Sequence, residues 1–291
     1  MKEIEILNGK KIGNAEFIEK GGELYGRIRN YGVVADYKIS EVTFEKPAEA
    51  VLTDLDGTTL QSEEFWVYII EKTVKKLLGD EKFSLTDEDV PYVSGFTTVD
   101  HLNYCIGKYA RGKDINEAVE VYHEIAEEEL AKIMRGEGFT SAFKPADGLK
   151  EFLLGLKKKK VKIGLATSGL DYKAIPEITA AFRNIGLGNP LEFYDSIITG
   201  GRRKDTGDYG SIGEIAAKPH PWIYAELAYS GLKITDSARV IGVEDSAAGV
   251  MSLRFAGFAV IGLESGNIAK SGLDCLCEKK VSRLTEILDL I

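Results

Sequence analysis

Two aspartates stand at the end of a short apolar run, in the stretch Val51-Leu52-Thr53-Asp54-Leu55-Asp56-Gly57-Thr58-Thr59. Side chains at positions i and i+2 of a strand point the same way, so Asp54 and Asp56 can face one site beyond a strand end. Two carboxylates held close together are electrostatically costly unless a cation or a shared proton offsets them. Oxygen ligands suit Mg²⁺, and one carboxylate could act as a nucleophile while the other moves a proton. The alternative is an ordinary Asp-Gly turn after a strand.

Apolar periodicity places these carboxylates in an alternation of strands and helices. Apolar runs predict strands at 49–54, 161–166, 193–198, 238–243 and 258–263. Helical spacing predicts helices at 148–156, 174–185, 219–230, 247–256 and 281–290. This alternation predicts an α/β fold with a doubly wound parallel sheet, which binds ligands at the carboxyl ends of its strands. Asp54, Thr167 and the pair Glu244-Asp245 all lie at the carboxyl ends of predicted strands, so we expect them to meet there.

Two segments fall outside this alternation. Residues 1–46 combine short apolar pieces with turn signals such as Asn8-Gly9, which predicts a small β extension of three or four strands. The extension would pack on the main domain as a structural addition, or serve dimerisation or substrate access. Residues 63–145 show helical spacing in three stretches. We therefore expect a β extension at 1–46, a core domain at 47–62 and 146–291, and an all-helical domain at 63–145.

The composition excludes several kinds of partner and site. The 291 residues carry a net charge of −9, which provides no electrostatic footprint for nucleic acid or an anionic membrane. No apolar run approaches the roughly 18 residues of a transmembrane helix, and Glu3 and Glu5 interrupt any signal-peptide core. The three cysteines, Cys105, Cys275 and Cys277, are too few for a disulfide framework. We expect a cytoplasmic protein with reduced thiols.

Four motifs follow one another along the chain: Asp54-Leu55-Asp56-Gly57-Thr58, Thr167-Ser168-Gly169, Lys218-Pro219-His220-Pro221 and Gly242-Val243-Glu244-Asp245-Ser246-Ala247-Ala248-Gly249. Taken singly, each has a plainer interpretation as an exposed lysine, a helix cap or a turn. Together, and in this order, they resemble the four motifs of the haloacid dehalogenase (HAD) superfamily over about residues 47–291. The resemblance implies the Rossmann-like core of that superfamily.

The resemblance also implies catalytic roles. Asp54 would attack phosphorus and form an aspartyl-phosphate, and Asp56 would donate and then accept a proton. Lys218 would offset the charge of the nucleophile and the phosphoryl group. Superfamily members of the dehalogenase and phosphonatase types lack an aspartate two residues after the nucleophile. Asp56 therefore favours phosphoryl transfer to or from an oxygen.

Phosphate and metal ligands are implied in the same way. Thr167 would hydrogen-bond the phosphoryl oxygens, and the further candidates for phosphate contacts are Thr58, Ser168 and Gly169. The cofactor would be Mg²⁺, held by Asp54, by the backbone carbonyl of Asp56, by Asp245, and by Glu244 either directly or through water. Metal and lysine together stabilise the charge that develops in phosphoryl transfer.

The helical segment between the first and second motifs resembles the cap of the subfamily that contains phosphoglycolate phosphatase and β-phosphoglucomutase. Residues 95–101 occupy the place of the substrate-facing loop of that cap, so the candidates for substrate contacts are Thr97, Thr98 and His101. Thr98 has the alternative of capping a helix. The polar loop 199–217 carries three cations that are either solvated or reach a second anionic group of a substrate: Arg202, Arg203 and Lys204.

The implied activity is that of a Mg²⁺-dependent phosphatase for a small phosphorylated metabolite, such as a sugar phosphate or phosphoglycolate. β-Phosphoglucomutases carry a histidine where this chain has Trp66, which favours hydrolysis. A sugar phosphomutase is the alternative within catalysis. A non-catalytic binding protein on the same fold is a further alternative, which the complete set of motif residues argues against. A homo-oligomer is left open.

Overall fold

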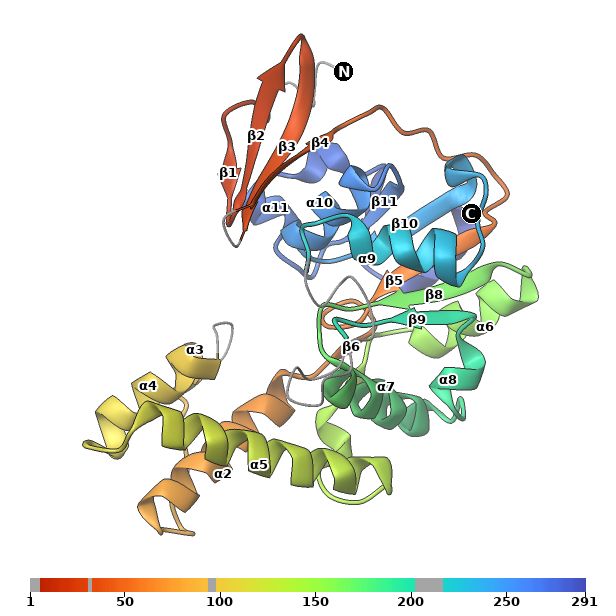
Figure 1. Cartoon of the computed structure of the whole chain (residues 1–291). Helices are drawn as coiled ribbons and strands as arrows, with labels where there is room; N and C mark the ends of the chain where they lie inside the picture. The colour runs from red at the N-terminus through yellow and green to blue at the C-terminus, as the bar shows by residue number, and fades with distance from the viewer. Residues whose placement is uncertain (1–5, 31–32, 94–97, 202–216) are drawn as a thin grey trace.

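A six-stranded parallel sheet forms the centre of the protein (Figure 1). The computed structural model describes residues 6–30, 33–93, 98–201 and 217–291. The strand order is β12-β11-β10-β5-β8-β9, and every neighbouring pair is parallel. The strands are β5 (Ala50–Asp54), β8 (Lys162–Ala166), β9 (Ser196–Ile198), β10 (Val240–Glu244), β11 (Ala259–Leu263) and β12 (Lys279–Val281).

Strand β5 lies in the middle of the sheet and is buried along its whole length. Its alternate side chains enter two different cores: Ala50 and Leu52 pack on one face of the sheet, and Val51 packs on the other. A continuous apolar run is typical of a parallel strand that is covered on both faces. Helices cover both faces, so the predicted doubly wound α/β fold is confirmed.

The helices divide between the two faces. The core that contains Val51 includes residues of α6 (Leu149–Lys158), α7 (Asp171–Ile185) and the 3₁₀-helix η7 (Leu284–Asp289). The opposite core includes residues of α9 (Trp222–Ala225), the π-helical turn η4 (Glu226–Gly231) that continues it, and α10 (Ala247–Phe255). The short elements α8 (Pro190–Phe193), η5 (Ser237–Arg239), α11 (Ile268–Ser271) and η6 (Asp274–Leu276) lie in the connections.

Several predicted elements of the core differ from the structure. The edge strand β12 was not expected. Its last residue, Val281, is the first residue of the helix predicted at 281–290, and within that predicted range only Leu284–Asp289 is helical, as a 3₁₀-helix. The strand predicted at 193–198 begins only at Ser196, because Pro190–Phe193 forms a short helix with proline at its first position. The helix predicted at 219–230 starts at Trp222 and widens into a π-helical turn.

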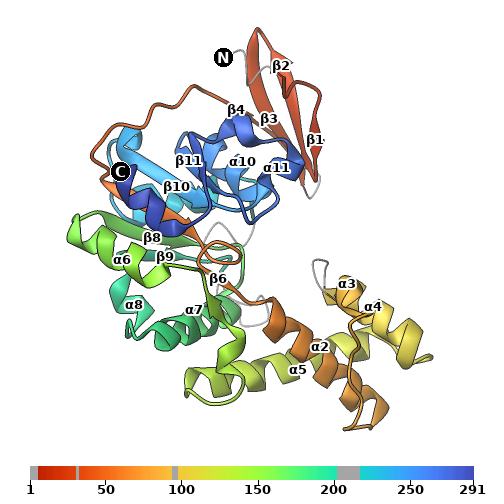
Figure 2. The same ribbon diagram turned by 180° about the vertical axis from the view of Figure 1, so that it is seen from behind.

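The all-helical block projects from one side of the core, away from the N-terminal sheet (Figures 1 and 2). It contains α2 (Glu63–Leu78), α3 (Val90–Val93), α4 (Thr98–Tyr109), α5 (Ile115–Met134) and the 3₁₀-helix η1 (Thr140–Ala142). The chain leaves and re-enters the core along an antiparallel two-stranded ribbon, formed by β6 (Leu60–Gln61) and β7 (Lys144–Pro145). None of the helices in the described part of the chain combines the length and apolar character needed to cross a bilayer.

The N-terminal segment forms a separate antiparallel sheet in the order β1-β2-β3-β4. Its strands are β1 (Lys11–Ile12), β2 (Ala15–Lys20), β3 (Glu23–Asn30) and β4 (Val33–Lys38). Phe17 and Ile28 are fully buried in the core that contains α10. The backbone of β3 lies directly on the ring of Phe255, where a Cβ on Gly26 would clash. The sheet therefore packs closely against α10.

In the described residues, Asn8-Gly9 lies in a turn as expected, but this turn does not join two strands of a hairpin. Residues 6–9 form a turn that precedes the sheet, and the first hairpin joins β1 to β2 through Gly13 and Asn14. Residues 1–5 of the predicted extension lie outside the described residues. The domain boundaries expected from the sequence stay a prediction.

Candidate active site

Three polar residues gather at the carboxyl ends of the central strands. Asp54 is the last residue of β5, Glu244 is the last residue of β10, and Thr167 follows β8. Strands β10 and β8 pair with β5 on its two sides, so their carboxyl ends lie at one edge of the sheet. From β5 the chain continues to one side and later to the other, which is the topology of a switch point. The sheet therefore places these three residues at the same edge, as expected from the sequence.

Lys218 lies at the centre of this group. Its Nζ is 2.5 Å from Asp54 Oδ1 and 2.7 Å from Glu244 Oε1, and it also donates to the hydroxyl of Tyr224 at 3.0 Å. The side chain of Lys218 is only 8% exposed. Burial opposes the charged form, but the two carboxylates outweigh burial and raise the pKa of Lys218 above its ordinary value. The lysine is therefore held as a cation against both carboxylates.

Three carboxylates form a cluster that suits a divalent cation. Asp54, Glu244 and Asp245 each offer an oxygen within 4.8 Å of the others' oxygens. Burial and the neighbouring Glu244 raise the pKa of Asp54 well above its ordinary value and raise the pKa of Asp245 to about 6. A hard cation with oxygen ligands would relieve this repulsion, so the residues present fit Mg²⁺.

The two oxygens of Glu244 are already engaged within the protein. Oε1 accepts from Lys218 and from Tyr224 at 2.6 Å, and Oε2 accepts from the hydroxyl of Ser246 at 3.0 Å. The carboxylate lies against the start of α10, where a Cβ on Gly249 would overlap it. Asp54 and Asp245 are therefore better placed as direct metal ligands than Glu244.

The expected phosphate-binding residues fall into two groups. Thr167 Oγ accepts from the backbone N–H of Gly169 at 3.0 Å, and Ser168 Oγ accepts from the backbone N–H of Lys218 at 3.2 Å. Residues 167–169 of the second motif therefore form a tight loop that also binds the backbone of Lys218. Thr58 is fully buried and donates its hydroxyl to Asp245 at 3.2 Å, so it supports a carboxylate rather than opening to a cavity.

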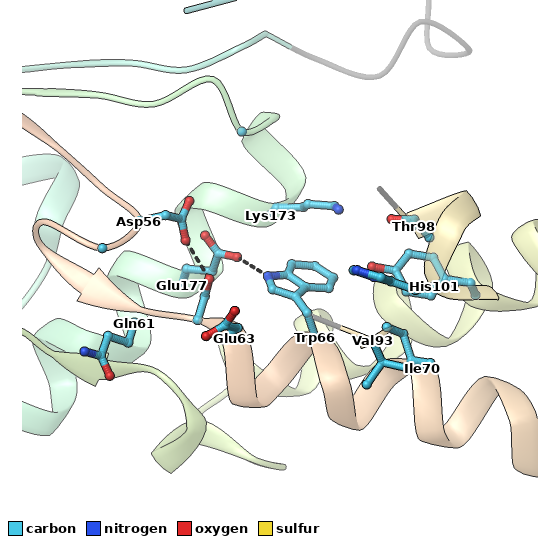
Figure 3. Close-up of a pocket in the computed structure, with 14 residues that line it drawn as sticks. Asp56, Gln61, Glu63, Trp66, Ile70, Val93, Thr98, His101, Lys173 and Glu177 are labelled. Carbon is cyan, nitrogen blue, oxygen red and sulfur yellow. Dashed lines mark hydrogen bonds between the residues drawn. The ribbon is translucent and has the colours of Figure 1, made fainter. Parts of the chain in front are cut away.

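A cavity of about 520 Å³ lies between the core and the helical block (Figure 3). Residues of the core that line it include Asp56, Gly169 and Lys173, and residues of the block include Thr98 and His101. Asp56 opens into this cavity and accepts a hydrogen bond from Ser62 at 2.6 Å. Asp56 is exposed to the cavity, and the partial loss of solvent around its carboxylate in this recess raises the pKa of Asp56. A carboxyl with a raised pKa can donate a proton.

The block side of the cavity carries two of the three residues expected there. Thr98 begins α4, and His101 lies one turn further along it. His101 is 8% exposed, and burial lowers its pKa. Thr97 lies outside the described residues, as do Arg202, Arg203 and Lys204. His220, the histidine of the motif that carries Lys218, binds Tyr37 of the N-terminal sheet.

Trp66, Lys173 and Glu177 form a wall of the cavity (Figure 3). The indole N–H of Trp66 donates to Glu177 Oε1 at 2.9 Å. The ammonium of Lys173 lies 4.1 Å from the centre of a Trp66 ring, within the range of a cation–π contact. Figure 3 shows the Lys173 side chain extending above Trp66 toward the end of the cavity where Thr98 and His101 lie. The wall therefore presents a cation to the cavity.

Sequence reasoning missed Lys173 and Glu177. They stand four positions apart on α7, which places them on one helix face. The predicted helix began at Ala174, and α7 begins at Asp171. A Lys–Glu pair at this spacing, directly after the second motif, was the available signal.

The model of one family, the haloacid dehalogenase-like hydrolases, matches residues 48–257. No curated protein sequence matches the chain. Among solved structures, a β-phosphoglucomutase candidate from Thermotoga maritima has a TM-score of 0.60 at 22% identity, and the match covers 83% of this chain and 97% of that one. A predicted phosphoglycolate phosphatase from Haemophilus somnus has a TM-score of 0.56 at 17% identity, covering 84% and 97%. CbbY from Rhodobacter sphaeroides, solved with xylulose 1,5-bisphosphate, has a TM-score of 0.52 at 19% identity, covering 82% and 96%. At these identities, the structural matches show a common fold.

Proposed function

This chain belongs to the haloacid dehalogenase-like hydrolases, and from that premise we propose that it is a Mg²⁺-dependent phosphatase for a small phosphorylated metabolite. The observation that supports this most is the contact of Lys218 with both Asp54 and Glu244, beside Asp245. It brings the proposed nucleophile, a buried cation and a candidate metal site together at one end of the sheet. These are the parts that phosphoryl transfer requires.

In the proposed reaction, a carboxylate oxygen of Asp54 attacks phosphorus, and the bond from phosphorus to the ester oxygen breaks. Asp56 gives its proton to that oxygen as the alcohol leaves. Water then attacks the aspartyl-phosphate, Asp56 takes a proton from the water, and the Asp54 carboxylate is released with inorganic phosphate. The hydrogen bond from Ser62 orients Asp56 for both steps.

Lys218 and the second motif hold the phosphoryl group in this proposal. The ammonium of Lys218 offsets the charge of the phosphoryl oxygens as well as that of Asp54. Thr167 accepts from Gly169 N–H, and its own hydroxyl proton can be donated to a phosphoryl oxygen. Asp54, Asp245 and the backbone carbonyl of Asp56 would hold Mg²⁺, which would supply further positive charge to the reacting phosphate.

Trp66 supports hydrolysis over a mutase reaction. An indole nitrogen only donates hydrogen bonds, and here it donates to Glu177, so Trp66 offers no proton-accepting group. The cavity volume and the ammonium of Lys173 support a polar, sugar-sized substrate. The sugar bisphosphate bound to CbbY belongs to the same chemical class. A cytoplasmic location and a homo-oligomeric state stay predictions.

Hydrolysis of p-nitrophenyl phosphate with Mg²⁺ tests the proposal, followed by a panel of sugar phosphates and phosphoglycolate. Asp54→Asn should lower turnover by about a thousandfold or more, and a chelator should abolish turnover. Asp87→Asn, an exposed aspartate on the helical block, is the matched control and should keep turnover. Isomerised sugar phosphate in place of released phosphate would indicate a mutase. Absence of turnover on every substrate, or full activity of Asp54→Asn, would contradict the proposal.

A further inference from the structure

The N-terminal sheet reaches the segment that carries Lys218 through the side chain of Tyr37, in β4. Tyr37 Oη lies 2.8 Å from Nδ1 of His220. Trp222, which opens α9, donates its indole N–H to the same oxygen at 3.0 Å. Because an indole nitrogen only donates, Tyr37 Oη accepts from Trp222 and can direct its own proton to His220. Burial lowers the pKa of His220 and so favours the neutral ring that accepts this proton.

The ring of Tyr37 is held in place by aromatic packing. It stacks on Phe255 with the ring centres 5.9 Å apart and an angle of 12° between the planes. It packs edge to face against the ring of His220, with the ring centres 5.8 Å apart and an angle of 86° between the planes. Phe255 in turn lies against Gly26 of β3. Tyr37 is therefore fixed by both the sheet and α10.

His220 is held by its ring and by its main chain. Its carbonyl accepts from the hydroxyl of Ser252 in α10 at 2.6 Å, and its N–H donates to Ala217 at 3.1 Å. Tyr37 contacts the ring. Lys218 stands two positions before His220, so any shift of His220 moves the attachment point of the lysine side chain. The ammonium of Lys218 must keep contact with two carboxylates at once.

We propose that Tyr37 is a positioning residue that holds the Lys218 segment through His220, so that the N-terminal sheet acts on the reaction centre. The inference rests on the proposed function, because that function makes Lys218 a catalytic group. Small displacements of a catalytic group lower the rate more than they weaken substrate binding. A loss of the Tyr37 contact should therefore lower kcat and leave KM nearly unchanged.

Tyr37→Phe is the first test, because it removes the hydroxyl and keeps the stacked ring. Removal of residues 1–46 is less suitable, since Phe17 and Ile28 would leave their buried sites. The matched control is Tyr25→Phe in β3, whose hydroxyl binds the exposed Glu23 at 3.2 Å. With p-nitrophenyl phosphate, Tyr37→Phe should lower kcat about three- to tenfold and change KM less than about twofold. Equal kcat values for the two variants would overturn the inference.

A second test is independent of turnover. The ammonium of Lys218 is buried among several acceptors, so its protons should exchange slowly enough to give a signal in a ¹H–¹⁵N spectrum of lysine side chains. The signal is assigned by its loss in Lys218→Met. It should shift in Tyr37→Phe and stay unchanged in Tyr25→Phe. An unshifted signal in Tyr37→Phe would overturn the inference even if the wild type proved inactive, so a failure of the proposed function remains distinguishable.

A double-mutant cycle separates positioning from a general loss of stability. His220→Leu removes the partner of Tyr37, and His220→Asn keeps a polar atom near the place of Nδ1. If Tyr37 acts through His220, the kcat of the double variant Tyr37→Phe/His220→Leu should equal the kcat of the less active of the two single variants. His220→Asn should recover part of the kcat that His220→Leu loses. Fully additive losses would overturn the inference.

Discussion

The indole N–H of Trp66 donates to the carboxyl group of Glu177 at a distance of 2.9 Å. This hydrogen bond joins α2 of the helical block to α7 of the core, and both residues line the cavity. Glu177 is 3% exposed. Burial, reinforced by the charge of Asp56, raises the pKa of Glu177 well above its ordinary value. The hydrogen bond from Trp66 therefore offsets part of the free-energy cost of burying the Glu177 carboxyl group between the helical block and the core.

Replacement of Trp66 by phenylalanine should destabilise the protein. The change removes the donor and leaves the acceptor of Glu177 buried, which costs about 1–3 kcal/mol. Urea unfolding at neutral pH would measure this loss. Glu177→Gln is the control, because its amide oxygen can still accept from the indole. A Trp66→Phe variant as stable as the wild type would show that water replaces the indole at Glu177.

The raised pKa of Glu177 predicts a pH dependence of stability with a definite sign. The folded state keeps the proton at pH values where the unfolded chain has already lost it, so the stabilising contribution is present below the ordinary carboxyl pKa. That contribution is lost as the pH rises through the raised pKa of Glu177. The free energy of unfolding of the wild type should therefore fall relative to that of Glu177→Gln as the pH rises.

Urea titrations at a series of pH values would measure the difference between the two proteins. Carboxyl groups that do not interact with Glu177 contribute almost equally to both proteins, so they cancel in the comparison, and the remaining difference belongs to Glu177 together with Asp56. A difference that stays constant with pH would mean that Glu177 titrates like an exposed carboxyl group.

Protons should compete with Mg²⁺ at Asp245. Burial and the nearby Glu244 raise the pKa of Asp245 to about 6. Since a carboxylate must be deprotonated to bind metal, the half-saturating Mg²⁺ concentration should rise about tenfold for each pH unit below about 6. Turnover measured over a range of Mg²⁺ concentrations at each pH would give this half-saturating concentration, and thermal-shift titrations with Mg²⁺ would provide a second readout. Asp245→Asn should need more Mg²⁺ at neutral pH and lose the part of the pH dependence that comes from Asp245, while the part that comes from Asp54 remains. Unchanged Mg²⁺ affinity in that variant would exclude Asp245 as a ligand.

Lys173 should select the part of the substrate that lies away from the reacting phosphate. A hydrogen bond to a charged group contributes about 1.5–3 kcal/mol, so Lys173→Met should raise KM for the preferred sugar phosphate about tenfold or more. The KM for p-nitrophenyl phosphate, which lacks hydroxyl groups, should rise much less. Lys158→Met, an exposed lysine at the end of α6, is the control. Equal effects of Lys173→Met on both substrates would argue for a structural role of Lys173 above Trp66.

The cluster of polar residues at the carboxyl ends of the central strands could be predicted because each of these residues follows or ends a recognisable apolar run. The proximity of Asp54, Thr167 and Glu244 follows from one rule, which is that the carboxyl ends of parallel strands lie at the same edge of a sheet. The edge strand β12 escaped prediction because its sequence, Lys279-Lys280-Val281, is charged, as edge strands often are. Its strand character comes from pairing with β11, not from an apolar pattern.

Contacts between elements that are distant in the sequence could not be predicted from the sequence pattern. Nothing local links Tyr37 to His220, which stand 183 positions apart. The alternation of β4 indicates a strand, but the pattern does not say against which helix the strand packs. The same holds for Trp66, whose partner Glu177 is 111 positions away. The surroundings of Lys173 likewise depend on how the helical block docks on α7.

The ribbon of β6 and β7 has a consequence for how the chain folds. Leu60 pairs with Pro145 and Gln61 with Lys144, so the chain re-enters the core where it left it. The central pairing of β5 with β8 joins distant positions, such as Thr53 and Leu165, which are 112 positions apart. The entropy cost of closing a loop grows with its length. Once the ribbon has formed, the helical insertion no longer adds to the length of the loop that must close between β5 and β8. The remaining entropy cost of pairing β5 with β8 is then that of a much shorter loop.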